Sequence, residues 1–323
     1  MSTAPSPALA FASPLPLSRL VEHYGGAVDP GAGSLLVAGL APVDSAQVGQ
    51  LAPFVARRYL RAARSSGAAL LVDASLASLL PAGRRWLHPQ AGYALARLLM
   101  DLAPPPPPDE RALAHIDPAA WVDPSASIGV GAVIRAGAVI GPGCRVEPHA
   151  VIYGGSHLGA RVRIGAGAVI GRPGFGWTQG PEGALVAIPQ LGGVRIEDDA
   201  EVGPLGTVDA GTLGPTVIGR GSKLDAHVHV GHNGQIGAGT IIAAQCGFAG
   251  SAEVGAGVRM GGQAGVADHV RIGDGARIAA KSGVIGDVDP GASVAGYPAI
   301  ERVRWLRATA RALHDLDERP KKS

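Results

Sequence analysis

The chain has 323 residues, of which 46% are hydrophobic and 17% are charged. This balance is typical of a folded protein with a sizeable core, and the length exceeds that of one ordinary domain. A net charge of +2 and an aromatic content of 4% give no reason to expect a nucleic-acid partner. No apolar run reaches the length of a membrane span, and the N-terminus lacks the basic residues of a signal peptide. We therefore expect a cytoplasmic protein without stable membrane insertion.

The N-terminal third of the chain shows no long repeat. We expect residues 1–16 to be disordered and residues 17–103 to form a small α/β domain. Within that domain, short apolar runs alternate with helix-like segments, at residues 34–40, 55–63, 68–72 and 93–102. Five consecutive prolines, Pro104–Pro108, begin a stiff extended linker that we predict for residues 104–116.

From Trp121 onward, aliphatic side chains recur at every sixth residue. They are Val122, Ile128, Ile134, Ile140, Val146, Ile152, Leu158, Ile164 and Ile170, and the count resumes at Ile218 after an interruption. Neither the period of a helix nor that of a strand gives this spacing. It is typical of a left-handed parallel β-helix, in which three hexapeptides form one triangular coil. We expect this fold over residues 117–299, with residues eighteen apart stacked at the roughly 4.8 Å spacing of paired strands.

Residues 300–323 are predicted to form a C-terminal helix and tail. Apolar residues there follow helical spacing, at Val303, Leu306, Ala310 and Leu313, and arginines occupy other positions. The basic face is either solvated or meets an acidic partner. Cys144 and Cys246 both fall at small, inward positions of the repeat, so we expect buried thiols and no disulfide.

The six-residue count is interrupted between Gly171 and Val194. The interruption begins with the glycine-rich aromatic segment Arg172–Trp177. A loop expelled from a rigid prism either contacts a ligand or is a tolerated surface insertion, and function concentrates on loops that a scaffold holds.

Three of the ten histidines lie within six residues, at positions 227, 229 and 232. The inward register of Val228 and Val230 predicts that these histidines point outward or lie at corners. Counting in eighteens places two columns side by side on one edge of the prism, His232–Gly250–Asp268 and Asn233–Ser251–His269.

These columns suit acyl transfer with direct attack by the acceptor. An imidazole with a pKa of about 6.5 can accept a proton at neutral pH, as we expect of His232. A bare glycine amide at Gly250 can donate to a developing oxyanion. A solvated polar corner is the alternative.

The spacing of His227 and His232 also resembles the zinc site of γ-class carbonic anhydrases, but Gln263 stands two coils above His227, so we predict no metal.

A series of motifs resembles, in the same order, those of UDP-3-O-(3-hydroxyacyl)glucosamine N-acyltransferases of lipid A biosynthesis. The motifs are Phe175-Gly-Trp177, Ile188-Pro-Gln-Leu-Gly192, Thr207-Val-Asp209, Thr216-Val-Ile-Gly219, Leu224-Asp225, Gly231-His-Asn233, Ala249-Gly-Ser251, Gly261-Gly262 and His269. The likeness runs from about residue 17 to 313 and is strongest between 164 and 300.

The resemblance implies that His232 takes a proton from the glucosamine 2-amine as that amine attacks a thioester, and that the Gly250 amide supports the oxyanion. It implies His269 and Asp225 as further catalytic residues. It implies substrate contacts by Tyr59, Phe175, Trp177, Gln190, Asn233 and Ser251. The implied donor is the phosphopantetheine arm of acyl carrier protein, without a tightly bound cofactor. The implied acceptor is a UDP-amino sugar, and the implied assembly is a homotrimer with active sites between subunits.

Two motifs depart from the family pattern. Where the family has Phe-x-x-Asn-Pro-Lys-Tyr for its uracil pocket, the segment Pro53–Tyr59 keeps only Tyr59 of the recognition residues. Asp209-Ala210-Gly211 lacks the arginine of the family's Asp-Arg-Gly. These departures leave open a paralogous acyltransferase for another amino sugar, with a carrier-protein or acetyl-coenzyme A donor. A non-catalytic hexapeptide scaffold is the other alternative.

Overall fold

A computed structural model describes residues 9–103 and 109–317. The chain divides into two compact units, Met1–Pro106 and Pro107–Ser323. The division falls in the proline run, which lies outside the described residues.

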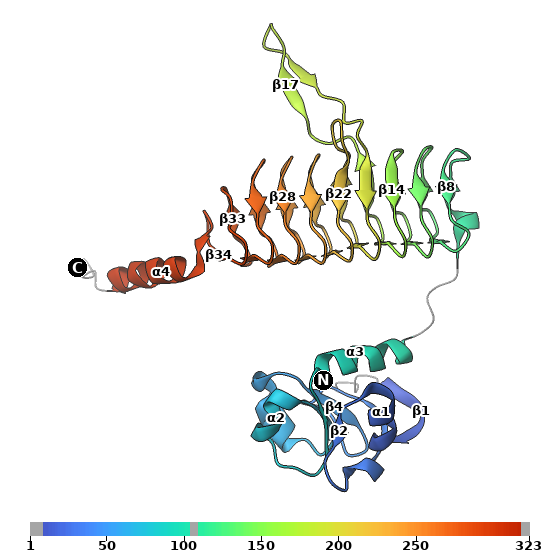
Figure 1. Ribbon diagram of the computed structural model, residues 1–323, viewed down its shortest axis with the longest axis vertical. Coiled ribbons are helices and arrows are strands. Elements are labelled where there is room, and N and C mark those ends of the chain that lie inside the picture. Colours follow the sequence, from blue (N-terminus) through green and yellow to red (C-terminus); the bar gives the residue numbers. More distant parts are fainter. Residues whose placement is uncertain (1–8, 104–108, 318–323) are drawn as a thin grey trace, which may run out of the picture. The chain divides into compact units, whose positions relative to one another are not determined.

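The N-terminal unit is a six-stranded sheet with helices, as the α/β prediction requires (Figure 1). In spatial order its strands are β1 (Leu9–Pro16), β3 (Leu36–Leu40), β4 (Leu51–Phe54), β5 (Ala69–Asp73), β6 (Arg85–His88) and β2 (Ala27–Val28). The helices are α1 (Leu17–Tyr24), α2 (Leu60–Ser65) and α3 (Ala91–Leu102), with short 3-10 turns η1 (Ala32–Ser34), η2 (Arg57–Tyr59) and η3 (Ala74–Leu79). The four central strands are parallel, and β1 and β2 pair antiparallel at the two edges.

The prediction that residues 1–16 are disordered was wrong for residues 9–16. These residues form β1, which pairs with β3. Phe11 and Leu15 pack against a core that contains the fully buried Leu17 and Trp86. The strand is stable because a neighbouring strand supplies its hydrogen bonds, a partner that local composition does not reveal. Residues 1–8 lie outside the described residues.

The second unit is the predicted left-handed parallel β-helix, whose strands stack into three sheets (Figure 1). The first sheet consists of β7 (His115–Ile116), β10 (Val133–Ile134), β13 (Val151–Ile152), β16 (Val169–Arg172), β21 (Thr207–Asp209), β24 (His229–Val230), β27 (Gly247–Phe248), β30 (Gly265–Val266) and β33 (Gly283–Val284). The second consists of β8 (Trp121–Val122), β11 (Val139–Ile140), β14 (Ser156–Leu158), β19 (Val194–Ile196), β22 (Thr216–Ile218), β25 (Gln235–Ile236), β28 (Glu253–Val254) and β31 (Arg271–Ile272).

The third sheet runs to the C-terminal end of the prism. It consists of β9 (Ser127–Ile128), β12 (Arg145–Val146), β15 (Arg163–Ile164), β20 (Glu201–Val202), β23 (Lys223–Leu224), β26 (Ile241–Ile242), β29 (Arg259–Met260), β32 (Arg277–Ile278), β34 (Ser293–Ala295) and β35 (Ile300–Glu301). The short helix η4 (Arg111–Leu113) precedes the prism, and α4 (Arg302–Asp317) follows it. The first coil therefore begins at His115, inside the segment predicted as linker.

The six-residue repeat explains the packing of each coil. Ile134, Ile152 and Ile170 stack in register, and each is fully buried. In the regular coils, the residue three places after most of the inward aliphatics turns a corner with φ near +60°, a conformation that favours glycine and is also accessible to asparagine. Gly131 and Asn233 occupy such corners with φ of 68° and 60°.

Two insertions break the eighteen-residue step. The first carries the hairpin of β17 (Trp177–Gln179) and β18 (Leu185–Ala187), which projects from the prism (Figure 1). The second follows β21, so that Thr207 pairs with His229, twenty-two residues later. Beyond His229 the regular step returns, and His229 pairs with Gly247. In the described ranges, no helix is long and apolar enough to cross a bilayer.

Candidate active site

A pocket of about 430 Å³ lies where β21, β24 and β27 stack on the first sheet. It is lined by Phe175, Asp209, His229, Gly231, His232, Gly247, Phe248, Ala249 and Gly250. Two insertion-bearing segments and two regular coils therefore contribute to one site. This arrangement places two imidazoles, one carboxylate and a bare glycine beside one another.

His232 lies directly over Gly250, as the eighteen-residue spacing predicts. A Cβ atom added at Gly250 would lie only 2.5 Å from Nε2 of His232. Any side chain at position 250 would therefore displace the imidazole. The other ring nitrogen, Nδ1, lies 3.0 Å from Nδ2 of Asn233.

The amide N–H of Gly250 is available because of its position in the repeat. Within the described residues it has no hydrogen-bond acceptor, since it falls two places after Phe248, outside the ladder of the first sheet. Prolines, which lack this hydrogen, occupy the equivalent positions of other coils at Pro142, Pro148 and Pro204. The fold thus leaves this N–H unpaired, and at Gly250 it borders the pocket.

Asp209 is the most buried polar residue of the pocket, with 1% of its surface exposed. Nη2 of Arg172 donates to its Oδ2 at 3.2 Å, and Nε lies 2.9 Å from Oδ1. The Nε contact is an ion pair without the alignment of a hydrogen bond, so Oδ1 accepts none from the described residues. Burial raises the pKa of Asp209 to about 6, although Arg172 and His232 favour its ionised form.

His229 lines the pocket beside Asp209. Its Nε2 lies 3.9 Å from Oδ2 of Asp209, and its Nδ1 lies 2.6 Å from the hydroxyl of Thr207. Burial lowers the pKa of His229, and the positive charge of Arg172 lowers it further. His229 is therefore expected to be neutral at pH 7 despite the neighbouring carboxylate.

The glycine-rich segment that begins the first insertion covers Asp209. A Cβ atom at Gly174 would lie 2.8 Å from Cβ of His232 and 3.3 Å from Cβ of Asp209, so only glycine allows this approach. Phe175 follows it and lines the pocket, with 80% of its surface exposed. Trp177 begins β17 and lies 6.4 Å from Phe175 between ring centroids.

Gln190, at the end of the same insertion, is 7% exposed and connects the loop to Asn233. Its Oε1 accepts a hydrogen bond from the hydroxyl of Thr212 at 2.7 Å. Asn233 contacts both the backbone N–H and the hydroxyl of Thr212. Two residues predicted to contact substrate, Gln190 and Asn233, thus belong to a network behind His232.

Other predicted site residues lie outside the pocket. Ser251 and His269 occupy the corners stacked above Asn233, where the N–H of Ser251 donates to the carbonyl of His232 at 2.8 Å. His269 is exposed and does not line the pocket. Asp225 follows β23 on the third sheet, whereas His232 follows β24 on the first, so the structure does not bring Asp225 to His232.

The residues that the sequence interpretation left out of the site are Arg172, Asp209, His229 and Thr212. Asp209 and Thr212 do not precede His232 by a multiple of eighteen residues, because the second insertion lengthens that coil. Counting in eighteens therefore does not place them beside His232. The segment Thr207-Val-Asp209 could have indicated Asp209, because Val208 occupies an inward position of the first sheet and pairs with Val230, two residues before His232.

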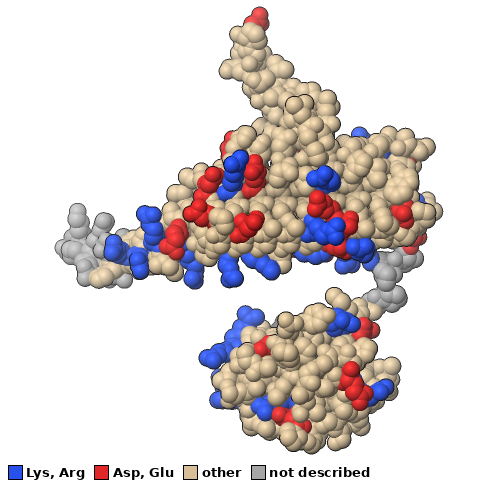
Figure 2. All heavy atoms as spheres, viewed as in Figure 1, with Lys and Arg blue, Asp and Glu red and all other residues tan. Residues whose placement is uncertain are grey.

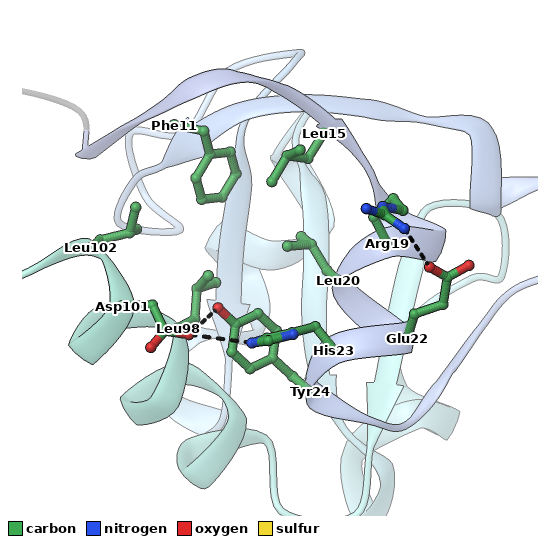
Figure 3. A pocket seen from close by; sticks show the side chains of 10 residues that line it. All are labelled: Phe11, Leu15, Arg19, Leu20, Glu22, His23, Tyr24, Leu98, Asp101 and Leu102. Atoms are coloured by element: carbon green, nitrogen blue, oxygen red, sulfur yellow. Dashed lines mark hydrogen bonds and ion pairs between the residues drawn. The ribbon is translucent and has the colours of Figure 1, made fainter.

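Tyr59 lies in the N-terminal unit, whereas this pocket belongs to the second unit. It ends η2, is 39% exposed and lies under the guanidinium of Arg58 at 4.9 Å. The N-terminal unit has its own pocket of about 350 Å³ between β1, α1 and α3, which Tyr59 does not line (Figure 3). In Figure 3 the hydroxyl of Tyr24 points to Asp101 and donates to it at 2.7 Å.

Groups of acidic, histidine or cysteine side chains do not converge on a metal-binding geometry anywhere in residues 9–103 and 109–317. Cys144 and Cys246 are buried and free, and burial raises the pKa of both thiols.

Comparisons with known proteins match both sequence and fold. A model of the bacterial transferase hexapeptide (six repeats) matches residues 137–172. The UDP-3-O-acylglucosamine N-acyltransferase of Anaeromyxobacter sp. (strain K) is 40% identical over 331 aligned positions, covering 93% of this chain and 92% of that protein. The enzyme of the same name from Paraburkholderia phytofirmans is 40% identical and covers 72% of each chain. Among solved structures, UDP-N-acetylglucosamine O-acyltransferase from Moraxella catarrhalis superimposes with a TM-score of 0.55 at 26% identity, covering 65% of this chain and 85% of that chain.

Proposed function

Since the chain belongs to the UDP-3-O-acylglucosamine N-acyltransferase family, we propose that it moves a 3-hydroxyacyl chain from acyl carrier protein to the 2-amine of UDP-3-O-acylglucosamine in lipid A biosynthesis. The protein is an acyltransferase that acts on an amino-sugar nucleotide. The observation that carries the finer proposal is the stacking of His232 on Gly250, whose unpaired N–H borders the same pocket.

His232 acts as the general base in the proposed reaction. The nitrogen of the 2-amine attacks the thioester carbonyl carbon, and Nε2 of His232 takes a proton from that nitrogen. The carbon–sulfur bond then breaks, the acyl carbon keeps its new bond to nitrogen, and the proton on His232 passes to the departing sulfur. No covalent acyl-enzyme is needed, because the amine is itself the nucleophile.

Gly250 stabilises the negative charge that develops on the thioester oxygen. Its N–H has no competing acceptor in the described residues and borders the same pocket as Nε2 of His232. A preorganised donor of this kind typically contributes about 10²–10³-fold to turnover. The absence of a side chain at position 250 is needed both for the imidazole and for the approach of the carbonyl.

Asp209 favours the positive charge that His232 carries after it accepts the proton. The two groups interact electrostatically, and Asp209 is shielded from water by the Gly174 segment. Arg172 partly neutralises the carboxylate but is itself 40% exposed, so solvent screens its effect. His229 remains neutral beside them, so it adds no charge next to Asp209.

We further propose that acyl carrier protein binds along a basic surface at the C-terminal end of the prism. Outward positions of the third sheet near this end carry Arg259 and Arg277. The helix α4 adds exposed arginines at positions 302, 304, 307 and 311. Figure 2 shows basic side chains along this edge of the prism and over the helix. Such a surface attracts an acidic partner, whose phosphopantetheine arm would bring the thioester. Because the proposed donor is a carrier protein, we also propose a cytoplasmic location.

A homotrimer with active sites between subunits is also part of the proposal. The β17–β18 hairpin exposes Leu185 and Val186 at 72% and 50%, and a two-stranded hairpin is marginally stable in water alone. A second copy of the chain would cover these side chains.

The test is acyl transfer by the purified protein with 3-hydroxyacyl carrier protein and UDP-3-O-acylglucosamine. The proposal predicts formation of the N-acylated product and release of free carrier-protein thiol in equal amounts. Turnover with a different amino sugar, or with acetyl-coenzyme A, but none with this pair would replace the proposed substrates.

A further inference from the structure

A continuous line of hydrogen bonds runs from the first insertion to the ring of His232. Nε2 of Gln190 donates to the carbonyl of Ile188 at 2.9 Å. Oε1 of Gln190 meets the hydroxyl of Thr212 at 2.7 Å, and that hydroxyl meets Nδ2 of Asn233 at 3.0 Å. Nδ2 of Asn233 lies 3.0 Å from Nδ1 of His232.

The first half of this line has one possible direction. A backbone carbonyl only accepts, so the group of Gln190 that contacts Ile188 must be its NH₂. The oxygen of Gln190 then faces Thr212 and can only accept, so the Thr212 hydroxyl donates its single hydrogen there. The Thr212 oxygen is left as an acceptor for the next residue.

The second half is fixed twice over. The Thr212 hydroxyl accepts from Nδ2 of Asn233, and the backbone N–H of Thr212 donates to Oδ1 of Asn233 at 2.7 Å. Both contacts orient the Asn233 amide in the same way, so they identify which of its two terminal atoms is the oxygen and which is the nitrogen. The second hydrogen of Nδ2 therefore points to Nδ1 of His232.

An NH₂ group cannot accept, so Nδ1 of His232 must carry a lone pair. A neutral imidazole has one ring proton, which then lies on Nε2, the nitrogen over Gly250. We propose that Gln190, Thr212 and Asn233 are positioning residues that hold the ring proton of resting His232 on Nε2, so that the base is ready only after this line of hydrogen bonds reverses. The inference rests on the proposed function in naming His232 as the base.

Reversal has a defined geometry and proton balance. Nε2 loses its proton to solvent, Nδ1 gains one from solvent, and the Asn233 amide turns so that Oδ1 accepts from Nδ1. The turn breaks the bond from the Thr212 N–H and requires Gln190 to release the Thr212 hydroxyl.

Phe175 connects this reversal to the acceptor. Its neighbour Gly176 packs on Gln190, where an added Cβ atom would lie 2.5 Å from Nε2 of Gln190. Phe175 itself lines the pocket. An acceptor that contacts Phe175 would therefore lie next to the segment that packs on Gln190, the residue that begins the line of hydrogen bonds.

The experiment is ¹⁵N NMR of histidine-labelled full-length protein above pH 8, with His232 identified by the loss of its signals in His232→Ala. We expect a protonated Nε2 and an unprotonated Nδ1 in the free protein. Asn233→Asp offers only acceptor oxygens to both Thr212 and His232, so the ring proton should move to Nδ1. The acidic limb of its kcat/KM profile should shift upward by about one pH unit.

Gln245→Glu is the matched control, because it adds the same charge at an equivalent corner with φ of 63°, where the Gln245 side chain accepts a hydrogen bond from Gln263. It should change neither the tautomer nor the pH limb. A protonated Nδ1 in the free wild-type protein would overturn the inference, as would one tautomer shared by wild type and Asn233→Asp. Because the spectrum requires no turnover, a protonated Nε2 in a protein without acyl transfer would reject the proposed function while supporting the tautomer assignment.

Discussion

Gly250 shows how one residue serves two purposes in the pocket. Its missing side chain makes room for the imidazole of His232, and its N–H has no acceptor in the described residues. Gly250→Ala should lower kcat by at least about 10²-fold, since the new Cβ atom would lie 2.5 Å from Nε2 of His232. Steady-state kinetics and a thermal melt of the same preparation measure the effect.

Gly286→Ala provides the control for that change, because a Cβ atom there meets nothing within 4 Å. It should retain activity and melting temperature. A Gly250→Ala protein with wild-type kcat would contradict the role given to this glycine.

The burial of Asp209 predicts how the free energy of unfolding changes with pH. Its pKa is about 6 in the folded chain, against 3.8 for an exposed group, so the folded state binds the proton more tightly. The stabilising contribution is complete below pH 3.8 and is lost as the pH rises to about 6. Relative to Asp209→Asn, the wild type should therefore lose up to about 3 kcal/mol of unfolding free energy over this range.

Urea unfolding of both proteins at several pH values between 4 and 8 measures this difference. The partly exposed Arg172 can be solvated in the variant, so its lost ion pair should add only a small constant offset. A difference between the two proteins that does not change with pH would contradict the burial of an ionisable Asp209.

The sequence predicted some residues of the site and missed others for a geometric reason. His232 and Gly250 are eighteen residues apart in regular coils, so the eighteen-residue length of one coil predicts their contact. Asp209 belongs to the coil that an insertion lengthens, where the count fails. The motif resemblance instead pointed to Asp225, which follows a strand of another sheet.

At the scale of elements, the coils depend on inward residues that stack. Ile152 in β13 is fully buried between Ile134 and Ile170. Ile152→Ala should lower the unfolding free energy by about 2–5 kcal/mol through lost burial and the cavity left behind. The neighbouring Val151 points outward, and Val151→Ala should cost less than about 1 kcal/mol. Equal losses in thermal or urea unfolding would contradict the assigned register.

The prism was predictable because its period is carried by local sequence and repeats over many coils. The β1 strand was not, since residues 9–16 owe their order to pairing with β3, twenty or more residues away. The hydrogen bonds behind His232 were also beyond sequence reasoning, because they depend on where the insertion returns Gln190 to the prism.

At the scale of the whole molecule, we expect an assembly of three chains. The exposed apolar residues of the β17–β18 hairpin are expected to be covered by other copies of the chain. Light scattering of the purified protein should give three times the 32.4 kDa mass of one chain. A monomer at micromolar concentration would contradict the proposed shared active sites.

Turnover of His232→Ala with 3-hydroxyacyl carrier protein and UDP-3-O-acylglucosamine tests the role of His232 as the general base. We expect active wild-type protein and a loss of at least about 10²-fold in kcat for the variant, because Nε2 of His232 is the ring nitrogen that lies over Gly250. His227→Asn is the control, since it changes a histidine of the same run at a corner with φ of 59°, outside the pocket, and should keep its activity. A folded His232→Ala protein with undiminished turnover would show that His232 is not the general base.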